Sequence, residues 1–191
     1  HRGDPGMTFS LVARCADTGM FGTAIASSSP AVAARCSYTR AGVGAVSSQN
    51  ITDPRLGPLA LDLMQGGLSA KAAISKVQAQ GQFMEYRQVL AIDPNGSTAI
   101  HSGPRSLGIW TQASGQDVIA AGNLLANAQV PQAMVAGFEA ATGHLGDRLI
   151  AAMTSDLRHR ALAGGRSAVR LDRRLPDCGA DRSMGRIFSA A

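Results

Sequence analysis

The sequence predicts an α+β protein in which helices are layered on a largely antiparallel pair of sheets. Strand-like runs, two helical stripes, further strand-like runs and two more helical stripes follow one another along the chain. Turn signals separate neighbouring strands by only a few residues, which favours antiparallel pairing. Each helical stripe is apolar on one face only, so each helix has to bury that face against another layer.

The first two strands are predicted on either side of a turn. Residues 7–13 alternate apolar and polar side chains, as a half-buried strand does. Residues 21–27 are also strand-like, and the intervening Asp-Thr-Gly at 17–19 is a turn signal. If the two strands form a hairpin, the serines at 27–29 lie beside Thr8 at the start of the first strand.

The next segment contains one strand and two helices. Residues 31–36 are apolar but of ambiguous type, and residues 42–48 form the predicted third strand. That strand ends at Gln49 and Asn50, two amides that could line a site. Helical stripes follow at 56–64 and 70–77; Gly66-Gly67 ends the first helix and Ser69 caps the second.

The second half repeats the pattern of strands followed by helices. Strands are predicted at 86–92 and 97–101, because the Asp-Pro-Asn-Gly between them is a strong hairpin signal. Two further strands are predicted at 106–111 and 117–121. Apolar stripes then predict helices at 130–141 and 145–153, with Pro131 near the start of the first.

The end of the chain differs in composition. Residues 154–191 contain eight arginines and four aspartates, so they carry +4 of the net charge of +5. They show neither alternation nor a helical stripe of any length, which predicts either a poorly structured tail or a region whose order depends on contacts with other parts of the protein. The domain proper is therefore expected at 8–153, after a leader of residues 1–7. Because the domain is nearly neutral, we expect no nucleic-acid partner; binding by the tail remains a weaker alternative.

Composition excludes several other classes. No apolar run approaches the roughly 20 residues that cross a bilayer, and residues 1–6 are polar, so no membrane association and a cytoplasmic location are expected. The three cysteines are widely spaced and the four histidines are scattered, which indicates neither a disulfide framework nor a metal site. We predict no cofactor.

Thr8 suggests a specific chemistry. If Met7 and everything before it are removed, Thr8 carries both a hydroxyl and a free α-amine. An α-amine titrates at roughly 7.7–8.0, so it can act as general base for the hydroxyl near neutral pH. The alternative is an ordinary threonine opening a strand, where its β-branch suits the extended backbone.

Five short motifs occur in order and at fitting distances: Met7-Thr8-Phe9-Ser10, Ala24-Ile25-Ala26-Ser27, Ala41-Gly42-Val43-Gly44-Ala45-Val46 with Ser48-Gln49-Asn50, Glu85-Tyr86-Arg87-Gln88, and Ala121-Gly122-Asn123. Together they resemble the bacterial family of unknown function called DUF1028, which is counted within the Ntn-hydrolase superfamily. The resemblance covers about residues 8–153.

The resemblance implies a four-layer αββα sandwich of the Ntn-hydrolase type and an amide-bond hydrolase with Thr8 as nucleophile. The substrate would be a small amide or an acylated amine. Ser27, Ser28, Asn50 and Asn123 are candidate catalytic residues that would help to form the oxyanion hole. Arg87 is a candidate for binding a substrate carboxylate, and Gln49 is a further candidate for substrate binding.

Each assignment has an alternative. Asn123 also suits a helix cap, Arg87 also suits an exposed strand position or an ion pair with Glu85, and a serine cluster also suits a turn. The whole protein could instead be a non-catalytic binding or assembly module that keeps the sandwich. The tail does not supply the further strands that would complete the sandwich, so one layer is expected to be incomplete and a homo-oligomer to cover it.

Overall fold

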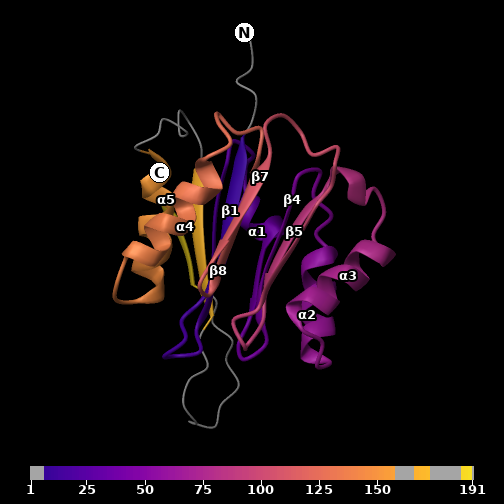
Figure 1. Cartoon of the computed structure of the whole chain (residues 1–191), viewed down its shortest axis with the longest axis horizontal. Helices are drawn as coiled ribbons and strands as arrows, with labels where there is room; N and C mark the ends of the chain where they lie inside the picture. Colours follow the sequence, from indigo (N-terminus) through magenta and orange to yellow (C-terminus); the bar gives the residue numbers. More distant parts are fainter. Residues whose placement is uncertain (1–6, 158–165, 173–185, 191) are drawn as a thin grey trace.

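Two sheets face each other, and a pair of helices covers the outer side of each sheet (Figure 1). The computed structural model describes residues 7–157, 166–172 and 186–190. The arrangement is mixed α+β with antiparallel strand pairs throughout the described sheets, as the order of elements predicts. No helix in these described ranges is long and apolar enough to span a membrane.

The larger sheet has the strand order β10-β9-β2-β1-β8-β7. Its strands are β1 (Thr8–Arg14), β2 (Phe21–Ser27), β7 (Thr111–Gly115), β8 (Val118–Asn123), β9 (Arg166–Asp172) and β10 (Arg186–Ala190). The predicted hairpin is confirmed: β1 pairs with β2 so that Thr8 lies opposite Ser27. On its other side β1 pairs with β8, which places Asn123 opposite Thr8.

The smaller sheet has the order β3-β4-β5-β6. Its strands are β3 (Ser37–Arg40), β4 (Gly44–Gln49), β5 (Gln88–Ile92) and β6 (Thr98–Ser102). The turn after Asp93 joins β5 to β6 as predicted, because the Asp93 side chain accepts bonds from the backbone N–H groups of Asn95 and Ser97. The register places Gln49 opposite Gln88 at one end of this sheet.

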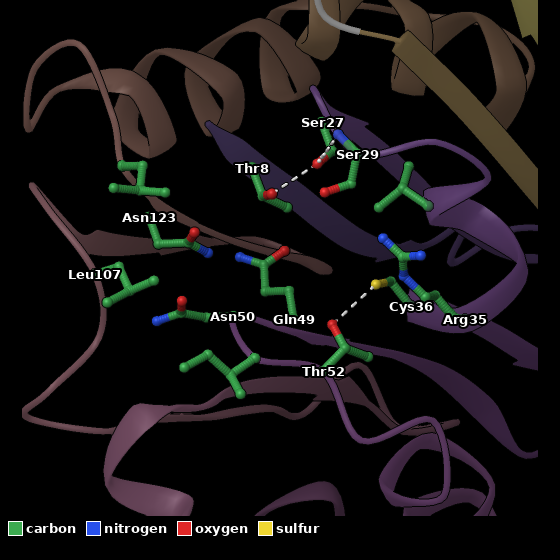
Figure 2. A pocket seen from close by; sticks show the side chains of 13 residues that line it. Thr8, Ser27, Ser29, Arg35, Cys36, Gln49, Asn50, Thr52, Leu107 and Asn123 are labelled. Atoms are coloured by element: carbon green, nitrogen blue, oxygen red, sulfur yellow. Dashed lines mark hydrogen bonds between the residues drawn. The ribbon is translucent and has the colours of Figure 1, made fainter. Parts of the chain in front are cut away.

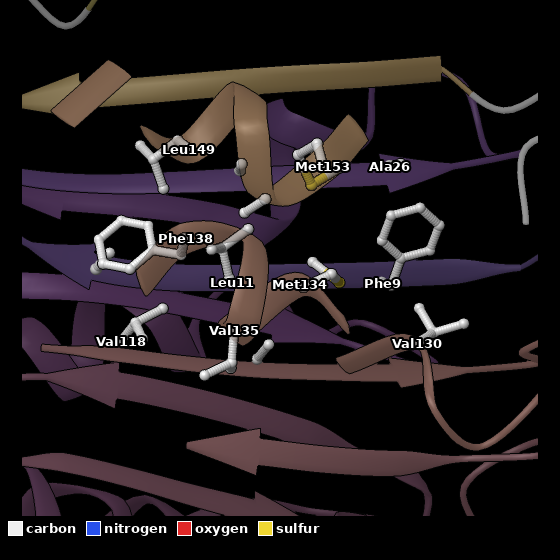
Figure 3. Packing of buried hydrophobic residues seen from close by; sticks show 14 of the residues in the cluster. Phe9, Leu11, Ala26, Val118, Val130, Met134, Val135, Phe138, Leu149 and Met153 are labelled. Carbon is white, nitrogen blue, oxygen red and sulfur yellow. The ribbon is translucent and has the colours of Figure 1, made fainter. Parts of the chain in front are cut away.

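The four long helices are α2 (Leu56–Gln65), α3 (Ala70–Gln80), α4 (Val130–Ala140) and α5 (Leu145–Leu157). Their apolar stripes pack on the two sheets as the sequence predicts. The Ser69 hydroxyl accepts a bond from the Ala72 N–H and caps α3, and Gly66 ends α2. Figure 3 shows Phe138, Met134 and Leu149 of α4 and α5 over Phe9 and Leu11 of β1.

Three of the four apolar clusters among the described residues lie between these layers. One lies between the larger sheet and α4 with α5, and a second lies between the smaller sheet and α2 with α3. The third joins the facing sides of the two sheets, where Val12 and Phe21 of the larger sheet meet Leu90 and Ile92 of the smaller one. Strands that face both a helix layer and another sheet are buried on both faces, which explains the fully buried β2.

Two predicted element boundaries are wrong, and the structure decides one segment that the sequence leaves ambiguous. Residues 106–110 are a loop rather than a strand, because Gly108 adopts a left-handed φ of 62° that breaks the extended backbone, and β7 begins only at Thr111. The strand predicted to start at residue 86 is preceded by a 3₁₀ turn, η1 (Met84–Tyr86), and begins only at Gln88. The ambiguous segment forms a short helix, α1 (Val32–Cys36), and the unpredicted β3 follows it directly.

The prediction of a tail without strands is also wrong. β9 and β10 both come from residues 154–191, and β9 pairs with β2 along its whole length. The sequence pattern does not reveal β9, because charged and apolar residues are mixed along residues 166–172 instead of alternating strictly. The larger sheet is therefore extended by the tail, so the described structure gives no reason to expect an oligomer that covers a missing layer.

Candidate functional site

The end of the larger sheet at which β1 begins brings together residues far apart in the sequence. Thr8 starts β1, and Ser27 and Asn123 end its two neighbours, so strand register alone places the three side by side. The Thr8 Oγ1 and Ser27 Oγ atoms are 2.8 Å apart and share a hydrogen bond. The nearby Ser29 N–H donates to the same Ser27 oxygen at 3.1 Å.

These residues open into a cavity of about 450 Å³ between the ends of the two sheets (Figure 2). Five of the residues predicted for the site line it: Thr8, Ser27, Gln49, Asn50 and Asn123. The other described lining residues are Ser29, Val32, Arg35, Cys36, Ile51, Thr52, Leu107 and Leu124.

A row of buried amide side chains, linked by hydrogen bonds, lies between the two sheets beside the cavity. Gln49 accepts a 2.6 Å bond from Ser10 and donates both to Gln88 and to the Ala121 carbonyl. Gln88 also accepts from Asn123 Nδ2 at 3.1 Å. Because the described partners occupy much of the capacity of Gln49 and Gln88, these two side chains are suited to positioning Asn123 rather than to binding a ligand themselves.

Asn50 is the exception among these amides. Its side chain is only 6% exposed, and neither its Nδ2 nor its Oδ1 has a hydrogen-bond partner among the described residues. Its backbone is left-handed at φ 61°, and Ile51 follows at φ 50°. A buried amide without partners is costly unless something else satisfies it. Figure 2 shows the Asn50 side chain in the cavity on the same side as Asn123 and Leu107.

Two predicted site residues lie elsewhere. Ser28 is exposed and is not among the described lining residues; its N–H donates to the Met7 carbonyl at 3.2 Å. Arg87 is buried against Asp53, with 3.3 Å between Nη1 and Oδ2, so its ion-pair partner is Asp53 rather than Glu85. Arg87 is likewise absent from the described cavity lining.

The cavity contains a second candidate nucleophile, Cys36. Burial raises the pKa of the Cys36 thiol, which opposes formation of the reactive thiolate. Its Sγ is 3.3 Å from the Thr52 hydroxyl. The raised pKa makes Cys36 a poor nucleophile in this environment.

Sequence reasoning missed the residues that line the cavity without belonging to any motif. Arg35 and Cys36 come from the ambiguous α1 segment, and Leu107 comes from a loop that was predicted as a strand. Only Ser29 had a signal, as part of the serine cluster beside Thr8. No group of three or more His, Cys, Asp or Glu side chains that could hold a metal is found in the described part of the chain.

The fold and the cavity define a two-sheet α+β protein with a hydroxyl- and amide-lined pocket at one end of the sheets. The chain belongs to the family of unknown function DUF1028, whose family model matches residues 8–167. The match begins at Thr8 and reaches into β9. A crystal structure of a DUF1028 protein from Silicibacter pomeroyi is similar over 86% of this chain and 75% of that one, at 27% identity and a TM-score of 0.80. No curated protein matches the sequence.

Proposed function

We propose that this protein is an amidohydrolase of the Ntn type in which Thr8 is the nucleophile and a small amide or acylated amine is the substrate. The observation that carries the proposal is the position of Thr8: its hydroxyl lies in the cavity, 2.8 Å from Ser27 Oγ, at the first residue of the central strand. The family match begins at the same residue.

The reaction would use two groups of one residue. The free α-amine of Thr8 takes the proton from Oγ1 while Oγ1 attacks the substrate carbonyl carbon. The tetrahedral intermediate then collapses, the C–N bond breaks, and the amine returns its proton to the departing nitrogen. Water attacks the resulting ester by the same route and releases the acid and the Thr8 hydroxyl. Activity should fall as pH drops below about 8, where an α-amine becomes protonated.

Side-chain amides are the candidate oxyanion donors. Asn50 Nδ2 is buried in the cavity lining and has no described partner, so both of its N–H groups are available. Asn123 Nδ2 gives one N–H to Gln88, which leaves the second. The bonds of Gln49 and Gln88 hold Asn123 in place. Ser27 is suited to orient the Thr8 hydroxyl.

The mechanism requires that the peptide bond between Met7 and Thr8 be cut, since an amide nitrogen is not a base. The Ser28 N–H donates to the Met7 carbonyl oxygen. If Thr8 Oγ1 attacks this carbonyl, that N–H is positioned to stabilise the developing negative charge. In this scheme Ser28 would act in the cleavage of the Met7–Thr8 peptide bond that forms the mature chain, and not in hydrolysis of the substrate.

The test combines N-terminal sequencing with mutagenesis. We expect a mature chain that starts at Thr8, amide hydrolysis by that chain, and a loss of about 10⁴-fold or more in Thr8→Ala. Thr8→Ser should keep measurable activity because it retains the hydroxyl and the amine. Thr154→Ala is the matched control, because that exposed hydroxyl donates to the Ala151 carbonyl of its own helix and is absent from the described cavity lining.

A chain that keeps Met7, or hydrolysis that survives in Thr8→Ala, would contradict the proposal. In the first case the non-catalytic binding module becomes the better description of the protein.

A further inference from the structure

The cavity is positively charged on one side. Among its described lining residues Arg35 is the single charged side chain, and none carries a carboxylate. Arg35 is exposed, and the Tyr38 hydroxyl donates to its carbonyl oxygen at 2.7 Å, which holds the end of α1. An arginine that faces a cavity whose described lining holds no carboxylate favours an anionic ligand, and its planar donors suit a carboxylate.

The opposite side of the cavity is apolar. Leu107 and Ile51 line it although they are 40% and 53% exposed, and Leu124 lies next to Leu107 through a backbone bond from the Leu124 N–H to the Leu107 carbonyl. Exposed large apolar side chains around a cavity mark a surface that a ligand can cover. Figure 2 shows Leu107 and Arg35 on opposite sides of the view, with Thr8 and Gln49 between them.

The amide of Asn50, which has no described hydrogen-bond partner, lies on the Leu107 side of the cavity (Figure 2). Its Nδ2 and Oδ1 together need an acceptor and a donor, and these are the two groups that a secondary amide presents. A ligand amide that bonds Asn50 lies next to the apolar wall, and the rest of the ligand can extend past Thr8 and Gln49 toward Arg35. The cavity thus offers an apolar wall, an unsatisfied amide on the same side, and a cation on the opposite side.

We infer that the cavity takes an acylated amino acid, that is, an amide with an apolar acyl chain on one side and a carboxylate on the other. The acyl chain lies against Leu107, Leu124 and Ile51, and the carboxylate pairs with Arg35. Only the fate of this ligand rests on the proposed function: hydrolysis at Thr8 would release a fatty acid and an amino acid. Binding itself requires only the cavity.

The experiment measures binding of N-hexanoylglycine and of its uncharged carboxamide to the full chain by calorimetry. Thr8→Ala is the background, so that neither probe is consumed. We expect the acid to bind about tenfold more tightly than the carboxamide at low salt, and added salt to reduce this preference. Arg35→Gln should abolish the preference. Arg105→Gln is the matched control, since the Arg105 guanidinium bonds Tyr86 and is absent from the described lining.

A second variant tests the apolar side. Leu107→Ser should weaken the acid and the carboxamide alike, by about tenfold, because it removes apolar contact area from both. Equal binding of the two probes, a preference that survives Arg35→Gln, or no binding of either probe would overturn the inference. Hydrolysis is scored separately on the protein with Thr8 intact: selective binding without hydrolysis contradicts the proposed function, and hydrolysis without charge selectivity contradicts the inference.

Discussion

At the scale of single residues, unfavourable conformations are concentrated beside the cavity. Asn50 and Ile51 are consecutive left-handed residues, and a left-handed β-branched residue is rare. Asn50 is also buried without a described partner. Strained and unsatisfied groups persist where the surrounding structure holds them, and they gather at binding sites. These features of the end of β4 support the proposal that the cavity binds a ligand.

A pH prediction belongs to the buried carboxylate next to this segment. Hydrogen bonds from the Arg55 side chain, assisted by the charges of Arg55 and Arg87, lower the pKa of Asp53 from 3.8 to about 2. The unfolded chain binds this proton more readily, so stability is lost as pH falls from about 4 towards 2. In Asp53→Asn this part of the pH dependence should disappear, as urea unfolding across that range would show.

The same variant has an effect at neutral pH. Asp53→Asn leaves the buried Arg87 without its ion-pair partner, so we expect a loss of about 3 kcal/mol of unfolding free energy at pH 7. Asp62→Asn is the control, because that carboxylate is 65% exposed in its pair with Arg40 and should change stability by about 0.5 kcal/mol at most. Similar values for the two variants would contradict the role assigned to the Asp53–Arg87 pair.

At the scale of elements, α4 and α5 approach each other closely through a small residue. A Cβ atom at Gly137 in α4 would overlap the side chain of Ser155 in α5. The Ser155 hydroxyl also donates across the interface to the Ala133 carbonyl at 3.1 Å. The pair of helices that covers the larger sheet is thus held at a distance that only glycine permits at position 137.

This close approach reverses the usual effect of replacing glycine in a helix. Alanine normally stabilises a helix interior by about 1 kcal/mol relative to glycine, yet Gly137→Ala should destabilise the protein by about 1–3 kcal/mol through overpacking. Gly66→Ala at the end of α2 is the control, since its Cβ would meet no atom closer than 3.4 Å. Thermal unfolding measures both, and a Gly137→Ala protein as stable as the parent would show that the helices move apart freely.

At the scale of the whole molecule, the tail completes the larger sheet. β2 is buried in every residue, and β9 covers the edge that β2 would otherwise expose. An exposed apolar edge strand is prone to pair with other chains. Pairing with β9 therefore removes an exposed edge at β2.

Truncation tests this pairing. A chain that ends at Leu157 lacks β9 and β10, and we expect it to aggregate or to unfold at a temperature at least about 10 °C lower. A chain that ends at Asp172 keeps β9 on β2 and should stay much closer to the parent. Size-exclusion chromatography and thermal unfolding distinguish them. A stable, monodisperse chain ending at Leu157 would mean that the tail contributes little to the fold.

Local sequence information was enough for much of this protein. The four helices follow from apolar stripes, and the β1–β2 hairpin follows from a turn signal between two alternating segments, because both depend on neighbours within a few residues. The hairpin in turn predicts that Thr8 lies beside Ser27, which the register confirms. The sequence also places Gln49 and Asn50 together at the end of one strand.

The tertiary structure alone decided which distant residues share the site. Asn123 reaches Thr8 because β8 pairs with β1, and Arg35 and Leu107 line the cavity from segments that carry no motif. Likewise Arg87 turns away from the cavity lining to Asp53, and β9 docks on β2. These contacts join residues far apart in the chain, and no local periodicity encodes which strand edge or buried charge a given residue will meet. Local sequence patterns thus determined the helices and strands, while packing between the layers determined which residues form the site.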